Sequence, residues 1–139
     1  MPVITRTITV SSNGENDMID ITHQIDEAMK ATILQDGIVT ISVSGSTAAV
    51  TIIEYEPGLK KDFPKTLARI APSEIGYEHD NTWHHGNGHS HVRASLIGPS
   101  LTVPFNNKGL MFGTWQQIVL LEMDTKPRKR KIVLQMIGE

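Results

Sequence analysis

The short connections between strand-like segments in the second half of the chain limit its fold most strongly. Five segments there carry the β-branched, alternating pattern of strands, and turn sequences such as Asn106-Asn107-Lys108-Gly109 join them. Parallel strands need a crossover of about a dozen residues or more, and none of these connections is that long. The pattern therefore predicts an antiparallel meander built from residues 89–97, 100–105, 110–112, 114–123 and 132–137.

The first half of the chain adds further strands. Val3–Ser11 alternates threonine with apolar residues, which is typical of a strand with one buried face. Ser12-Asn13-Gly14 is a turn sequence that ends this segment. The same reasoning predicts strands over residues 18–21, 38–44 and 48–55.

Two helices are expected between these strands. The first begins at Thr22 and ends near Asp36-Gly37, and the second begins at Pro57. Pro64 removes a backbone donor inside the second helix, so we expect a kink or two short helices there. Residues 76–88 are polar, contain three glycines and are predicted to form a loop.

These elements predict one α+β domain over residues 1–139, with a mixed or antiparallel sheet of about eight strands and two helices. Few charges fall in residues 118–123 and 132–137, so both strands are expected to be covered on both faces. Either the helices or a second subunit can provide that cover.

Composition excludes several classes of function. The chain has no cysteine, which rules out a disulfide scaffold, a thiolate zinc site and an iron–sulfur cluster. Its net charge of −2 argues against a general nucleic-acid binder. No segment has the length or apolar character of a membrane span or a signal peptide, so a cytoplasmic protein is expected.

Five of the six histidines fall within thirteen residues, from His79 to His91. His89 and His91 are two apart at the start of a predicted strand, so their side chains are expected on the same face. Two imidazoles on one face can bind a divalent metal, or a phosphate when protonated. Asp80 and Glu54 are candidates to complete a metal shell. A solvated polar loop is the alternative interpretation.

Three other stretches have both a functional and a structural interpretation. Gly113-Thr114-Trp115-Gln116 is typical of a site for a heteroaromatic or phosphate ligand. The alternative is the start of a strand, with Trp115 half-buried against the core. Gly45-Ser46-Thr47 offers an anion cradle or a plain bulge between two strands. The five basic residues within 126–131 are interpreted as a solvated turn rather than a patch for an acidic partner.

Three of these motifs together resemble the YjbQ family. They are Gly76–Asp80, Asn87–Pro104 and Gly113–Gln116, in the order and spacing of that family. The resemblance implies an α+β fold assembled as a homotrimer, with sites near the subunit boundaries. It also implies thiamine-phosphate synthase activity, in which a pyrimidine diphosphate is joined to a thiazole phosphate with loss of pyrophosphate. Small phosphorylated ligands are therefore the expected partners.

The resemblance also assigns expected roles to individual residues. We expect catalytic roles for His79, Asp80 and His91, substrate binding by Ser46, Thr47, Asn87, Thr114, Trp115 and Gln116, and binding of a divalent metal such as Mg²⁺ or Zn²⁺ by His79, His89, His91 and Glu54.

One position departs from the family pattern. Members resembling this chain carry a histidine before the small-residue pair, and here Gly45 stands in that place. His84, His85 or His89 could replace the missing imidazole in space. Two hypotheses follow: an enzyme of the synthase type, or a non-enzymatic trimer that binds a metal or a small phosphate ligand.

Overall fold

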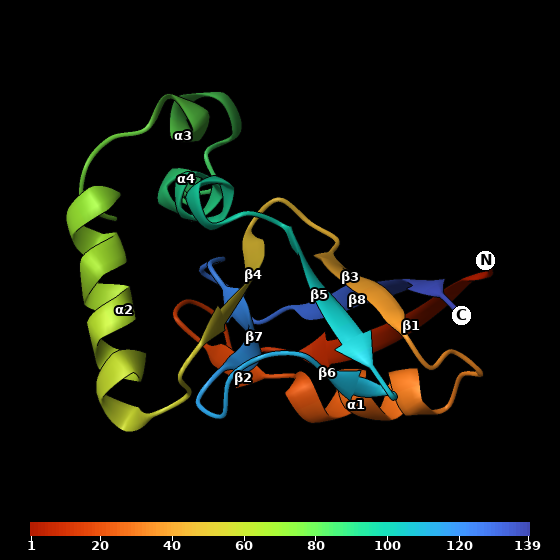
Figure 1. The fold of residues 1–139 in the computed structure, drawn as a ribbon. Coiled ribbons are helices and arrows are strands. Elements are labelled where there is room, and N and C mark those ends of the chain that lie inside the picture. The colour runs from red at the N-terminus through yellow and green to blue at the C-terminus, as the bar shows by residue number, and fades with distance from the viewer.

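The eight strands form two antiparallel sheets, which Figure 1 shows side by side. The structure is a computed structural model that describes residues 1–139. The larger sheet has the order β1-β8-β3-β5-β6, with bounds Val3–Ser11, Lys129–Gly138, Gly37–Val43, Ser100–Asn106 and Gly109–Leu110. The smaller sheet has the order β2-β7-β4, with bounds Met18–Asp20, Gln117–Glu122 and Ala48–Ile53.

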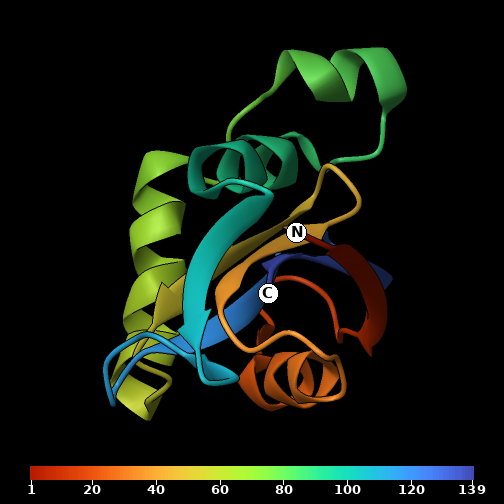
Figure 2. The ribbon, with the colours of Figure 1, turned by 45° about the vertical axis from the view of Figure 1, so that its right-hand side comes forward.

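Four helices complete the domain: α1 Thr22–Lys30, α2 Pro57–Ile70, α3 Glu78–Trp83 and α4 Gly88–Ile97. Figures 1 and 2 show α1 at one end of the molecule and α4 at the other, with α2 alongside the smaller sheet. The short α3 stands beyond α4 at the periphery. None of the four helices combines the length and apolar character needed to cross a membrane.

Strand β7 is the middle layer of the molecule. Its residues Ile118 and Leu120 pack in the large core cluster, together with α1 and the inner face of the five-stranded sheet. Val119 and Leu121 face the opposite way and pack in a second cluster with α2 and α4. Each of these four side chains is at most 1% exposed. The expectation that this strand is covered on both faces is therefore confirmed, and the cover comes from within the chain.

Most of the predicted elements are confirmed, and β1 has the predicted bounds. Helix α2 begins at Pro57 because the Glu56 carboxylate accepts hydrogen bonds from the first backbone N–H groups of the helix, those of Gly58 and Leu59. Of the two alternatives expected at Pro64, two short helices are wrong, since α2 continues from Pro57 to Ile70. Pro64 leaves the carbonyl of Lys60 without its helical partner, and Lys60 is exposed, so water can take that place.

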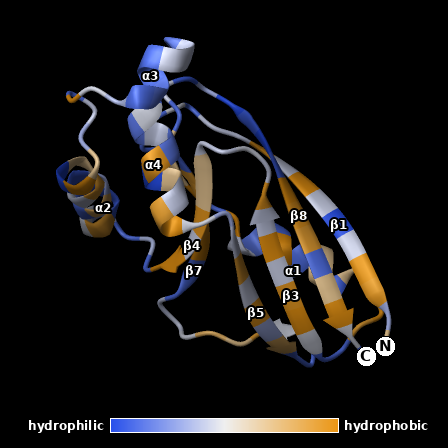
Figure 3. Cartoon of the chain, turned by 90° about the horizontal axis from the view of Figure 1, so that it is seen from above, coloured by the Kyte–Doolittle hydropathy of each residue, from blue (hydrophilic) through white to orange (hydrophobic).

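The segment from residue 76 to residue 97 differs most from the prediction. The expected loop contains α3, and the expected strand over residues 89–97 is helix α4. The buried side of α4 is formed largely by His89, Ser90 and Arg93, whereas the apolar Val92 and Leu96 are exposed. Placing the apolar residues inside therefore predicts the period of two of a strand, whereas the segment has the period of a helix. Figure 3 shows that α4 mixes polar and apolar residues, whereas α3 is polar throughout.

The predicted meander is also wrong, although every strand pair is antiparallel as expected. Only β5 and β6 form a hairpin, through the turn at Asn106–Gly109. β7 pairs with β2 and β4 in the smaller sheet, and β8 inserts between β1 and β3 in the larger one. The connections are too short for parallel pairing, but they do not prevent a strand from joining a different sheet.

The outer face of the five-stranded sheet is almost free of charge. Val3, Ile137, Ile38 and Pro104 form one row across four strands, and Thr5, Gln135, Thr40 and Thr102 form the next. Val3, Ile38 and Ile137 are 55%, 43% and 38% exposed. The expectation that β8 is covered on both faces is therefore not met within one chain.

Candidate functional site

Two neighbouring helices bring His79 and His91 together. α3 carries His79 and α4 carries His91, and their ring centroids lie 4.2 Å apart with the planes tilted by 49°. The Asp80 carboxylate accepts a hydrogen bond from the backbone N–H of Gly88 at 2.9 Å, which ties α3 to the start of α4. Nε2 of His79 is buried and has no hydrogen-bond partner within the chain. Because buried polar atoms are normally paired, this nitrogen is suited to a ligand or a bound water.

The surroundings of His91 favour its neutral form. Partial burial lowers the pKa of His91, and the nearby His79 lowers it further. Asp124 and Asp80 act in the opposite direction without cancelling the effect. At neutral pH His91 is therefore an uncharged imidazole that can donate or accept a proton.

Acidification is expected to weaken the fold in two steps. Because the pKa of His91 is lowered in the folded chain, the unfolded chain binds that proton more tightly, and stability falls as the pH drops below the ordinary histidine value of 6.5. The pKa of Asp124 is also lowered, so its contribution is lost as the pH falls below 3.8. Urea midpoints between pH 8 and pH 3 test this, and His91→Gln should reduce the upper step. A midpoint that rises between pH 7 and pH 5.5 would contradict the assigned direction.

His89 lies on a different side of α4 from His91. Two residues turn a helix by about 200°, so the common face expected from a strand does not exist here. His89 is 4% exposed, and its Nε2 lies 2.5 Å from Oε1 of Glu15 in the loop between β1 and β2. His89 therefore anchors α4 to that loop, and it does not join the His79–His91 pair.

Glu54 and the Gly113–Gln116 turn lie at the far end of the smaller sheet. Thr47 directly precedes β4 and Glu54 directly follows it, so the strand separates them by about 20 Å. β7 runs antiparallel beside β4, which places the turn before β7 next to the Glu54 end. Within one chain, these residues do not meet His79 and His91.

The Gly113–Gln116 turn is held by its own side chains. The Gln116 carboxamide oxygen accepts a hydrogen bond from the backbone N–H of Gly113 at 2.6 Å. Trp115 is 72% exposed, so the interpretation as a half-buried core residue is wrong. Thr114 is also exposed. The turn thus presents a flat aromatic surface to whatever lies outside the chain.

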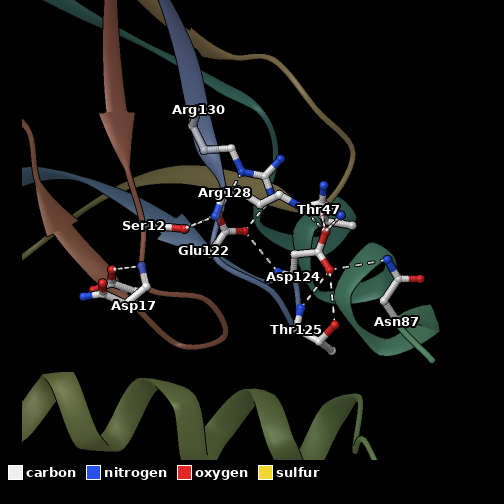
Figure 4. Close-up of polar contacts among 10 residues, drawn as sticks. Ser12, Asp17, Thr47, Asn87, Glu122, Asp124, Thr125, Arg128 and Arg130 are labelled. Carbon is white, nitrogen blue, oxygen red and sulfur yellow. Dashed lines mark hydrogen bonds and ion pairs between the residues drawn. The ribbon is translucent and has the colours of Figure 1, made fainter. Parts of the chain in front are cut away.

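Asp124, which no sequence motif predicts, connects two of the predicted residues, Thr47 and Asn87 (Figure 4). Its carboxylate accepts hydrogen bonds from Thr47 Oγ1 at 3.1 Å, Arg128 Nε at 2.9 Å and Asn87 Nδ2 at 3.5 Å. Burial alone would raise the pKa of Asp124, but the hydrogen bonds from Thr125, Arg128 and Thr47 outweigh it and keep the pKa low. Asp124 is therefore a fixed negative charge close to His91.

Thr47 and Asn87 are both buried at this cluster. The Thr47 hydroxyl donates to Asp124 and accepts from Arg130 Nη2 at 2.8 Å, so both of its hydrogen-bonding roles are occupied. Oδ1 of Asn87, by contrast, is buried without a partner. Ser46 is exposed beside Thr47, and its hydroxyl makes no hydrogen bond within the chain. Asn87 and Ser46 therefore keep binding capacity that Thr47 has used.

A buried ion pair between Glu122 and Arg130 holds the cluster in place. Glu122 is fully buried, and its carboxylate accepts hydrogen bonds from Arg130 Nη2 at 2.5 Å, Arg130 Nε at 2.9 Å and Ser12 Oγ at 2.7 Å. The Glu122 carboxylate also accepts a fourth hydrogen bond, from the backbone N–H of Asp124 at 3.1 Å, which links the pair to the site. Figure 4 shows this chain of contacts running from Ser12 to Asn87.

The sequence contains a signal for this ion pair. Lys129 and Lys131 are exposed while Arg130 between them is 7% exposed, which is the period of two expected in a strand. The interpretation of residues 126–131 as a solvated turn is therefore wrong at Arg130. Glu122 directly follows the apolar residues of β7 within the same buried strand, and this position is a second signal, for a buried carboxylate.

Gly45 allows the guanidinium of Arg130 to lie at the β3–β4 connection. Gly45 has a φ of +108°, a backbone conformation that side-chain-bearing residues rarely adopt. A β-carbon added there would lie 2.6 Å from Nη1 of Arg130. The place of the histidine expected from the family pattern is thus filled from a different strand by an arginine.

Restoring a histidine at this position should damage the protein. Gly45→His is expected to lower the free energy of unfolding by about 1–3 kcal/mol, because the backbone is strained and the new β-carbon collides with Arg130. Urea unfolding checks the value, with Ser44→His as the control at the neighbouring exposed residue. A Gly45→His variant as stable as the control would show that Arg130 moves aside easily.

The predicted metal ligands are not assembled within one chain. Of His79, His89, His91 and Glu54, only His79 and His91 are adjacent. No group of three or more His, Cys, Asp or Glu side chains is arranged to hold a metal ion. The residues present fit hydrogen bonding to a ligand by two imidazoles.

The fold and this cluster define a class: small α+β proteins whose two antiparallel sheets carry, at one end, a polar site of paired histidines supported by buried arginine–carboxylate contacts. A sequence model described as UPF0047 protein YjbQ-like matches residues 6–139. The chain belongs to the YjbQ family.

Individual relatives agree with this assignment. A UPF0047 protein of Archaeoglobus fulgidus is 33% identical over 92% of this chain and 97% of its own length. The UPF0047 protein YugU of Bacillus subtilis is 32% identical over 96% and 98%. A crystal structure of a YbjQ-like protein of unknown function from Sulfolobus solfataricus superposes with a TM-score of 0.91 at 29% identity, covering 99% of both chains.

Proposed function

We propose that the chain is a transferase of the thiamine-phosphate synthase type. The bond between the pyrimidine methylene carbon and the diphosphate oxygen breaks, and pyrophosphate leaves with the electron pair. The thiazole nitrogen then bonds to the methylene carbon. Such a reaction needs hydrogen-bond donors around the separating diphosphate, because its negative charge increases as the bond breaks.

The observation that carries this proposal is the His79–His91 pair, with the unpartnered, buried Nε2 of His79. The N–H groups of both imidazoles are suited to bind diphosphate oxygens. A bound polyanion would raise the pKa of His91, so substrate binding should take up a proton. Asp80 positions the pair through its hydrogen bond to the start of α4. Asn87 offers its buried Oδ1 to a donor group of the substrate.

A homotrimer is part of the proposal. The uncharged outer face of the five-stranded sheet, which contains Val3, Ile38 and Ile137, leaves apolar side chains in water in a single chain. Trp115 and Glu54 lie far from the histidine pair of their own chain, and in a trimer they are proposed to serve the site of a neighbouring subunit. Sedimentation equilibrium should give the mass of three chains, and a monomer at micromolar concentration would refute this part.

A divalent metal, Mg²⁺ or Zn²⁺, is proposed separately from the roles above. Bound at the site, it would neutralise diphosphate charge. Elemental analysis of the purified protein before and after treatment with a chelator tests it. One metal ion for each chain that disappears in His79→Ala would support the proposal, and metal-free protein with full activity would exclude it.

The decisive experiment supplies the pyrimidine diphosphate and the thiazole phosphate and measures thiamine phosphate and pyrophosphate together. Equal amounts of both products, formed in proportion to protein concentration, are expected. Pyrophosphate without thiamine phosphate would indicate hydrolysis, and no product at substrate concentrations up to millimolar would refute the transferase.

Gly45 favours a second candidate function, a non-enzymatic trimer that binds a metal or a small phosphate ligand. The chain lacks the imidazole that the family pattern places there, and Arg130 fills the space. This alternative predicts tight substrate binding without turnover in the same assay.

A further inference from the structure

The guanidinium of Arg130 has one nitrogen that the buried ion pair does not use. Nε and Nη2 donate to Glu122, and Nη2 also donates to Thr47. Nη1 makes no hydrogen bond within the chain, and Figure 4 shows no contact for it. It does not belong to the three buried polar atoms that lack a partner, so it retains contact with solvent. A side chain that is 92% buried thus directs one donor outward.

That donor emerges at Gly45. A β-carbon at residue 45 would lie 2.6 Å from Nη1, so only glycine leaves this side of the nitrogen open. Gly45 and Ser46 also line a depression of about 360 Å³, whose other lining residues are Ala48, Ala94, Ser95 and Pro99. No acidic side chain lines it. The depression itself thus offers the exposed Ser46 hydroxyl and no negative charge. Arg130 does not line it, and Nη1 adjoins it at Gly45.

The depression is close to the histidine pair. Ser95 is one helical turn after His91 on α4, and its hydroxyl donates to the His91 carbonyl at 2.8 Å. One turn of helix rises about 5.4 Å. A ligand with two charged groups can therefore contact the imidazole of His91 and the β3–β4 connection at the same time.

We propose that the Gly45–Ser46 turn and Nη1 of Arg130 form a binding subsite for one phosphoryl group. This inference rests on the proposed function, because it assigns the second phosphorylated group of the ligand to this place while the diphosphate occupies the histidine pair. Arg130 supplies a charge-assisted hydrogen bond, and Ser46 supplies a hydroxyl donor. Glu122 fixes the guanidinium so that little entropy is lost on binding.

Inorganic phosphate is the probe that tests the subsite, with binding measured by isothermal titration calorimetry at low ionic strength. Wild-type protein is expected to bind one phosphate for each chain at this place. Ser46→Ala should weaken binding about tenfold, since a hydrogen bond to a charged group is lost. Gly45→Ala should weaken it at least as much, because the new methyl group covers Nη1. Ser44→Ala is the matched control, and its affinity should be unchanged.

Each outcome bears on one proposal. Loss of phosphate binding in Ser46→Ala, with this variant unfolding at the wild-type temperature, supports the subsite. Gly45→Ala carries the same β-carbon as Gly45→His and should unfold at a lower temperature, so its affinity is compared only below that temperature and Ser46→Ala decides. Binding that is abolished by His91→Ala and unaffected by Ser46→Ala would overturn the subsite and leave the histidine site standing. Absence of any phosphate binding below 20 mM, on the order of the weakest useful affinity, would also overturn it, while product formation tests the transferase independently.

Discussion

Replacing Glu122 with alanine is expected to lower the free energy of unfolding by about 3–5 kcal/mol, which is a large part of the stability of a domain this size. The carboxylate is fully buried and holds Arg130, Ser12 and the backbone N–H of Asp124. Its removal leaves a buried guanidinium without its counter-charge. Urea unfolding monitored by far-ultraviolet circular dichroism measures the change.

A matched control separates this effect from the loss of any acidic residue. Glu27 pairs with His23 at 3.6 Å on the surface of α1, and both side chains are at least 70% exposed. Glu27→Ala should change the free energy of unfolding by no more than about 0.5 kcal/mol. The double variant Glu122→Leu/Arg130→Met should be more stable than Glu122→Ala, because no buried charge stays unpaired. A single variant that loses under about 1 kcal/mol would show that water reaches Arg130 easily.

Replacing His91 with alanine is expected to reduce the proposed synthase rate by about 100-fold to 10,000-fold. The imidazole stacks on His79, and its lowered pKa keeps it uncharged until a diphosphate arrives. Stability at pH 7 should change little, since His91 is partly exposed and makes no side-chain hydrogen bond. The rate of product formation and the urea midpoint are measured on the same preparation.

His23→Ala is the control, because His23 is exposed on α1, where it pairs with Glu27. Its rate should equal that of the wild type. Because substrate binding takes up a proton at His91, the wild-type KM should decrease as the pH falls toward the ordinary histidine value of 6.5, and His91→Ala should lose that part of the pH profile. Full activity in His91→Ala would remove this residue from the site.

The strands could be predicted from sequence because their burial follows hydrophobicity. β3 and β8 alternate buried residues with more exposed ones, and β1 places Ile4, Ile8 and Val10 on its less exposed face, so the sequence shows the period of two. α4 could not be predicted in the same way. It buries His89 and Arg93, which bond to Glu15 and to the backbone carbonyl of Ala71. Those partners are 74 and 22 residues away in the chain, so no local pattern reveals them.

The candidate site was predictable in part for a related reason. Clustering of histidines predicts His79 and His91, the chemistry of a metal shell predicts Asp80, and the family resemblance predicts Asn87. Helices α3 and α4 bring these residues together. Asp124 follows β7 and Arg130 lies in β8. Both are distant in sequence from the other site residues, and only the folded sheets bring them close. Glu54 was predicted as a carboxylate for a metal shell and Trp115 as an aromatic surface for a ligand, and a single chain places both at the other end of the smaller sheet.

The position of β8 has a consequence for how this protein is made. β8 pairs with β1 on one side and β3 on the other, yet it leaves the ribosome after both of them. Until then β1 has no neighbour in its sheet, and one edge of β3 is open to pairing with other chains. Arg130 is also added to the chain after Glu122, so the Glu122 carboxylate has no counter-charge until then. Folding of the nascent chain should therefore be late and all-or-none, and chaperones that shield open strand edges should raise its yield.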